Sequence, residues 1–258
     1  RHYWLSRFHH LVCDGIGSSI FGNAIVDEYN ALLQGGSTAE APSYLDLVEE
    51  ENRYLSSPRF ERDRAFWSAR FPSFPPPVFS RKHPVDAEKI SRSGSTSWRL
   101  ERDRFNRMKA VSSPFGGIVN LFLALIAVHA ARTAALEEVV IGMPVHNRTD
   151  ARRRSTVGMF SSMMPIAVQV SSGMTFSGVM AGIGAELRRC YRHQRLSIAE
   201  INRCIGFHDF DRNQLYDITF SYDPFQGDTK MGDIVPKAVR IHHEFEQIPL
   251  AVSVNDYH

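Results

Sequence analysis

Residues 8–15 read Phe8-His9-His10-Leu11-Val12-Cys13-Asp14-Gly15, and this stretch predicts the point where a β-strand ends and a helix begins. The residues before it, 2–8, are rich in aromatic side chains and alternate between two faces, as a strand does. Because successive side chains of a strand point to opposite faces, His9 and His10 are expected to point apart. Two such side chains cannot converge on one metal ion, whose bonds to nitrogen are about 2 Å long. We expect one imidazole to face a site and the other to support it, with no metal bound.

A helix is predicted directly after this stretch. Ser18 or Ser19 can cap its start, apolar residues follow at helical spacing, and Gly35-Gly36 can end it. The start of the helix then lies close to Asp14, where the positive end of the helix dipole favours negative charge. We therefore expect Asp14 to be ionised.

The remaining pattern predicts a mixed α/β fold. Helices are expected over 43–55, 59–71, 101–111, 117–133, 175–191 and 197–204, and strands over 95–100, 138–145, 166–170, 216–222, 239–245 and 250–254. Residues 72–84 contain Pro75-Pro76-Pro77 and predict a stiff extended linker, because proline does not continue a helix. This linker divides the chain into residues 1–71, 72–94 and 95–258.

Composition excludes several classes of protein. A net charge of +2 with 22% charged residues gives no general basic field for nucleic acid, and the run 152–154 of three arginines is expected to be a solvated loop. The most apolar stretch, 121–131, is shorter than the roughly 20 residues that span a bilayer. Cys13, Cys190 and Cys204 are odd in number and lack Cys-x-x-Cys spacing. We expect a soluble, cytoplasmic protein without disulfides, with no nucleic-acid or membrane partner.

The beginning of the chain indicates a fragment. There is no initiator methionine, and the predicted first strand needs neighbours to pair its backbone donors and acceptors. We expect a fragment that is inactive without its missing lobe.

His9, His10, Asp14 and Gly15 together form the pattern His-His-x-x-x-Asp-Gly, which resembles the signature of the condensation domain of non-ribosomal peptide synthetases. The wider superfamily, which includes chloramphenicol acetyltransferase, needs only the second His with the Asp and Gly, so the doubled histidine favours the synthetase branch. The resemblance implies a two-lobed chloramphenicol acetyltransferase-like α/β sandwich. The chain would supply the end of the N-terminal lobe and most of the C-terminal lobe.

A second segment, Pro144-Val145-His146-Asn147-Arg148, resembles the Pro-Val-x-x-Arg end of a condensation-domain strand. A carboxylate buried beside a catalytic histidine is costly unless it is paired, and a planar guanidinium is its usual partner. We therefore predict a salt bridge between Asp14 and Arg148. The alternative places Arg148 on a surface loop.

Three serines are candidate substrate-binding residues. Residues 157–165 resemble the Gly-x-Phe stretch that lines the tunnel between the lobes of condensation domains, with Ser161 and Ser162 in place of the commoner Val-Asn pair. Ser221, before Tyr222, occupies a family position that faces the active site.

The resemblance also implies a chemistry. Condensation domains join an acyl or peptidyl thioester on one carrier protein to an aminoacyl thioester on another, both held by phosphopantetheine arms. His10 would be the catalytic imidazole, His9 would orient the site, and Gly15 would let substrate approach the backbone. The domain would bind no cofactor of its own, and its partners would be the upstream and downstream carrier domains and an adenylation domain. Three alternatives share the fold: an acyl-CoA-dependent acyltransferase, an epimerization domain, and an inactive carrier-docking module.

Overall fold

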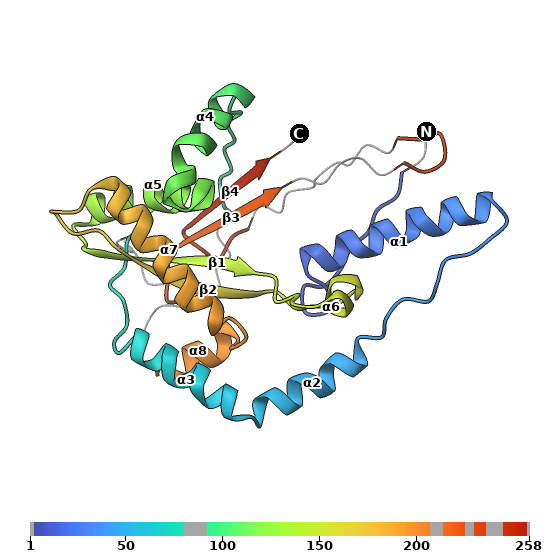
Figure 1. The fold of residues 1–258 in the computed structure, drawn as a ribbon, viewed down its shortest axis with the longest axis horizontal. Helices are drawn as coiled ribbons and strands as arrows, with labels where there is room; N and C mark the ends of the chain where they lie inside the picture. Colours follow the sequence, from blue (N-terminus) through green and yellow to red (C-terminus); the bar gives the residue numbers. More distant parts are fainter. Residues whose placement is uncertain (1–2, 80–91, 207–213, 225–229, 236–244, 257–258) are drawn as a thin grey trace.

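A four-stranded mixed sheet lies at the centre of the computed structural model, which describes residues 3–79, 92–206, 214–224, 230–235 and 245–256 (Figure 1). Its strands are β1 (Glu138–Val145), β2 (Ser162–Gln169), β3 (Ile218–Pro224) and β4 (Leu250–Asp256), in the order β2-β1-β3-β4. β1 is antiparallel to β2 and parallel to β3, and β3 is parallel to β4. β1 is the most buried of these strands, because β2 and β3 cover both of its edges.

Helices α5 (Gly117–Ala134) and α7 (Phe176–Arg192) pack on each other and on the sheet, with α4 (Arg102–Ser112) against α5. By length and composition alone, α5 is apolar enough to cross a membrane. In this fold Leu123, Ala124 and Ala127 of α5 are fully buried in the core. The helix therefore serves as a core helix here, as its apolar sequence predicts.

The remaining helices join the core to the start of the chain. α3 (Pro58–Arg70) packs on α8 (Ile198–Cys204), and α2 (Leu45–Leu55) leads from α3 towards α1 (Gly15–Leu33), which projects from the sheet (Figure 1). Trp67 and Phe71 belong to the same apolar core as β1, β2 and α7. The predicted division of the chain at residues 72–94 stays a prediction.

Most predicted helices are confirmed within two residues of their ends. The strands predicted over 2–8 and 95–100 are wrong in their described parts, since neither pairs with a described strand and a strand needs a hydrogen-bonded neighbour. The predicted strand 239–245 lies almost wholly outside the described residues. The cap of the first helix is Asp14, not Ser18 or Ser19, because the helix already begins at Gly15.

The three arginines at 152–154 are not a solvated loop. They lie in the short helix α6 (Ala151–Ser155), which Asp150 caps through the backbone N–H of Arg153. Arg152 forms an ion pair with Asp46 and Arg153 with Glu50, both on α2. These ion pairs fasten α2 to the segment that follows β1.

The connection from β3 to β4 reaches α1. One of its described parts, 230–235, contains a tight turn in which the N–H of Met231 donates to the carbonyl of Ile234 at 2.9 Å. Asn30 of α1 donates to the carbonyl of Lys230 at 3.0 Å and accepts from the N–H of Gly232 at 2.7 Å. This one side chain therefore ties the crossover between two strands to the helix that follows the His-His stretch.

Trp67 gives a direct test of the core. Its side chain is fully buried and its Nε1 donates to the carbonyl of His193 at 3.0 Å. Trp67→Phe removes this donor, so we expect the free energy of unfolding to fall by about 1–3 kcal/mol in urea titrations. Trp98, which is 86% exposed, is the matched control, and Trp98→Phe should change the free energy of unfolding by less than about 0.5 kcal/mol. Equal losses in both variants would contradict this packing.

Candidate active site

Asp14 joins the start of α1 to the loop that precedes β2. Its Oδ1 accepts from the N–H of Gly17 at 2.7 Å, which caps the helix. Its Oδ2 accepts from the N–H groups of Phe160 and Ser161 at 2.9 and 3.0 Å. Only 3% of Asp14 is exposed, so its charge is held almost entirely by protein donors.

Arg148 completes this arrangement from the end of β1. Its Nη2 lies 2.9 Å from Oδ1 of Asp14, and both side chains are buried. Its guanidinium also donates to the carbonyls of Thr156, Gly158 and Arg153, and it lies 4.3 Å above the ring of Phe160. The predicted salt bridge is confirmed, and the alternative of a surface arginine is wrong.

The hydrogen bonds decide the charge of Asp14. Burial alone would raise the pKa of its carboxyl group, but the backbone N–H groups of Gly17 and Phe160 and the guanidinium of Arg148 outweigh burial. The pKa of Asp14 therefore lies below its ordinary value. Asp14 is ionised at neutral pH, as its place at the helix start predicts.

The start of α1 and the loop before β2 are in close contact at two glycines. A Cβ added at Gly17 would lie 2.8 Å from the carbonyl oxygen of Gly158, and one added at Gly158 would lie 2.3 Å from the ring of Tyr44. The hydroxyl of Tyr44 donates to the carbonyl of Met159 at 2.9 Å. Sequence reasoning missed these three residues; their only signals were glycines at 17 and 158, whose partners lie far away in the chain.

The two histidines have different surroundings. Nδ1 of His9 accepts from the N–H of Leu11 at 3.1 Å, and the carbonyl of His9 accepts from the N–H of Val12 at 3.0 Å. His9 therefore fixes a tight turn. The His10 side chain is exposed, and among the described residues it has no hydrogen-bond partner. Its imidazole is therefore accessible to solvent.

Other groups near the turn limit the possible chemistry. No described atom outside its chain neighbours and its own helix lies within 4 Å of a Cβ built on Gly15, so that side of the backbone is open. The Cys13 thiol is buried, and burial followed by the charge of Asp14 raises its pKa, so it is a poor nucleophile. The described part of the chain contains no cluster of three His, Cys, Asp or Glu residues that could hold a metal ion.

Of the three candidate serines, only Ser161 contacts Asp14. The N–H of Ser161 binds Asp14, whereas Oγ of Ser162 accepts from the N–H of Ile198 at 3.3 Å. The hydroxyl of Ser221 bonds that of Ser253 on the adjacent strand at 3.0 Å. Substrate contact by any of the three stays a prediction.

Known proteins resemble this chain over most of its length. A sequence model described as Condensation domain matches residues 1–255. Surfactin synthase subunit 1 of Bacillus subtilis (strain 168) is 31% identical over 200 residues, which are 75% of this chain and 5% of that protein. The first condensation domain of the CDA synthetase superposes with a TM-score of 0.75 at 25% identity, over 88% of this chain and 50% of the other.

A mutant starter condensation domain of rhizomide synthetase, solved in complex with C8-CoA, has a TM-score of 0.74 at 25% identity. The match covers 87% of this chain and 51% of that one. The chain thus spans about half the length of these solved chains.

Asp14→Asn should unfold more easily at neutral pH. It leaves the Arg148 charge buried without its counter-ion, and breaking such a pair costs about 3–5 kcal/mol. Because the pKa of Asp14 is lowered in the folded protein, its stabilisation is present above the pKa of the unfolded chain, about 3.9, and is lost as the pH falls through the folded pKa.

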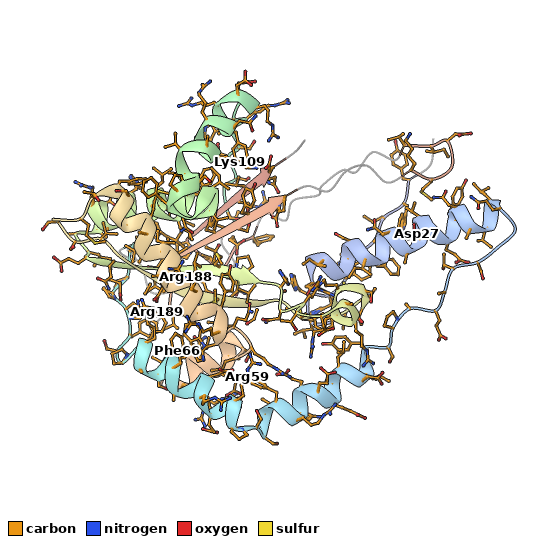
Figure 2. The ribbon with its side chains drawn as sticks, viewed as in Figure 1. Asp27, Arg59, Phe66, Lys109, Arg188 and Arg189 are labelled. Atoms are coloured by element: carbon orange, nitrogen blue, oxygen red, sulfur yellow. The ribbon has the colours of Figure 1, made fainter. Side chains whose placement is uncertain are left out.

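The difference in unfolding free energy between the protein and Asp14→Asn should therefore be full at pH 7 and shrink below about pH 4. Asp27→Asn is the matched control, on an exposed position of α1 (Figure 2). A difference that stays constant from pH 7 to pH 3 would show that Asp14 is not the titrating group.

Arg148→Lys tests the fork of hydrogen bonds rather than the charge. Lysine keeps the charge but cannot reach Asp14 and the carbonyls of Thr156 and Gly158 together, so we expect a loss of about 1–3 kcal/mol. Arg154→Lys, at an exposed position of α6, should change stability by less than about 0.5 kcal/mol. Thermal unfolding of both variants measures the difference, and an unchanged Arg148→Lys protein would contradict it.

Proposed function

Because this chain belongs to the condensation-domain family, we propose that it forms amide bonds between two carrier-bound substrates in non-ribosomal peptide synthesis. The α-amine of an aminoacyl thioester attacks an acyl or peptidyl thioester, and the thiol of the donor's phosphopantetheine leaves. The proposed partners are the upstream and downstream carrier domains and a neighbouring adenylation domain, in the cytoplasm. The mixed α/β fold agrees with the chloramphenicol acetyltransferase-like fold of the family.

The observation that carries this proposal is the contrast between Asp14 and His10. Each oxygen of the buried Asp14 carboxylate accepts hydrogen bonds from two protein donors. Asp14 is therefore not available to a substrate. His10, four residues earlier, is exposed and has no described partner. This arrangement supports a positioning role for Asp14 and Arg148 and a catalytic role for His10.

The magnitude of each contribution follows from ordinary pKa values. A free α-amine has a pKa of about 7.7–8.0 and histidine one of about 6.5, so much of the amine is already neutral near pH 7. Once the amine attacks, its nitrogen becomes far more acidic, and His10 accepts or steadies that proton. Placing the amine against the thioester contributes at least as much as this proton transfer, which is worth about 100-fold or more.

The solved condensation-domain chains are about twice as long as the matched part of this chain, and we propose that activity needs a comparable second half. His9 would hold the turn, and the open side of Gly15 would admit the thioester. The substrates would arrive on phosphopantetheine, with no cofactor bound by the domain itself.

A second candidate uses acyl-CoA as the donor. It is favoured by the similarity to the rhizomide starter domain, which was solved with C8-CoA. The same His10 and Asp14 geometry serves either donor, because both present a thioester of the same pantetheine thiol. The two candidates differ only in what delivers that thiol.

The test is condensation between donor-loaded and acceptor-loaded carriers, followed by mass spectrometry, in the full-length protein. We expect a dipeptidyl carrier, and a loss of about 100-fold or more in His10→Ala. His129→Ala, an exposed histidine on α5, should keep full activity. Consumption of acyl-CoA without a donor carrier would favour the second candidate, and epimerisation of one carrier-bound residue without joining would overturn both.

A further inference from the structure

A cavity of about 460 Å³ opens on the face of the sheet that α5 and α7 leave uncovered. Phe220 of β3 packs on Phe122 of α5, so the side chains of its neighbours Thr219 and Ser221 point to the opposite face; all three residues are among those that line the cavity. Pro144 of β1 and Met163 of β2 are paired in the sheet and line it as well. Its volume lies in the range of small-ligand sites, about 300–1,000 Å³.

The cavity adjoins the Asp14 site through the backbone. Ser161, whose N–H binds Asp14, lies two residues before Met163, and Arg148 lies four residues after Pro144. Two residues of extended chain span at most about 7 Å. The end of β1 and the start of β2 therefore connect the cavity wall to the salt bridge, and Figure 1 shows β1 ending, and β2 beginning, on the side of the sheet where α6 and the start of α1 lie.

One polar atom of the cavity lining, the side-chain oxygen of Gln214, lacks a hydrogen-bond donor among the described residues. Oε1 of Gln214 is buried and accepts no hydrogen bond from the part of the chain that the structure describes, which is rare in a folded protein. The Glu246 carboxylate at the rim accepts only from the N–H of Gln247, and no cation in the described parts of the chain pairs with it. The hydroxyl of Ser221 is already bonded to Ser253. A ligand that supplies an N–H donor would satisfy Oε1 of Gln214, and the exposed Glu246 carboxylate at the rim favours a positively charged donor.

Apart from Thr219 and Gln247, the other lining groups are apolar or aromatic. Met163, Tyr216, Phe245 and Ile248 surround the same space, so the body of the ligand is expected to be apolar. We infer that this cavity is a specificity pocket for a substrate side chain with an apolar stem and a terminal N–H donor, an amide or an ammonium group. The inference rests on the proposed function, and such a group can come from the acceptor amino acid or from the acyl donor.

The experiment varies one substrate at a time in the full-length protein. In the acceptor arm, glutaminyl and lysyl carriers compete with methionyl and leucyl carriers for one fixed donor. In the donor arm, the same four aminoacyl groups are placed on the donor carrier and compete for one fixed acceptor. We expect the N–H-bearing side chain to be preferred about 10-fold over its apolar counterpart in one arm, as one such hydrogen bond allows. The arm that shows the preference identifies which substrate occupies the pocket.

Two variants assign the preference to the cavity. Gln214→Met keeps the length of the side chain and removes the amide, and Glu246→Gln removes the charge at the rim. Together they should reduce the preference for the N–H-bearing substrate to near 1. The rate with methionyl substrates should stay as in the unchanged protein. Gln194→Met, between α7 and α8 and outside the cavity, should keep it. Calorimetry with glutaminyl and methionyl N-acetylcysteamine thioesters gives the same comparison without turnover.

The outcomes separate the two proposals. An active protein with no preference in either arm, or a preference that survives both substitutions, overturns the pocket alone. Loss of condensation with every substrate pair overturns the proposed function, and the calorimetric preference then still decides the pocket.

Discussion

The structure depends on a buried carboxylate that is neutralised by residues far away in the chain. Asp14 and Arg148 are separated by 134 positions, yet their side chains meet at 2.9 Å with almost no exposure to water. Removing two charges from water is costly, and the cost is offset only when each finds several partners of good geometry. Asp14 finds three backbone N–H groups and Arg148 three carbonyls, so the start of α1, the end of β1 and the loop before β2 are held in one arrangement.

In that arrangement some groups of the site are buried and others are exposed. The charge pair is closed to solvent, His9 fixes the turn, His10 remains on the surface, and one side of the Gly15 backbone is open. Catalysis by positioning needs such a rigid support, because a small displacement of a reacting group lowers the rate steeply. The side chain of Asn30 adds to this support, because it binds the β3–β4 crossover to α1, the helix that follows the turn.

The sequence predicted what depends on local pattern or on a chemical requirement. Helical spacing located α2, α3, α5 and α7. The need to pair a buried carboxylate, together with the resemblance of residues 144–148 to the end of a condensation-domain strand, predicted the bond between Asp14 and Arg148. It did not predict the contacts of Tyr44 with Gly158, or the ion pairs of α6 with α2, because these join segments about a hundred residues apart. The strands at 2–8 and 95–100 failed for the same reason: alternation predicts a strand, but only a neighbouring strand can pair with it.

A double-mutant cycle tests the central claim most directly. The unfolding free energies of the protein, Asp14→Asn, Arg148→Met and the double variant give the coupling between the two side chains. If the pair acts as one unit, the double variant is less destabilised than the sum of the single variants, with a coupling of about 0.5–3 kcal/mol. Strictly additive losses would show that Asp14 and Arg148 stabilise the fold independently, and would contradict this account of the site.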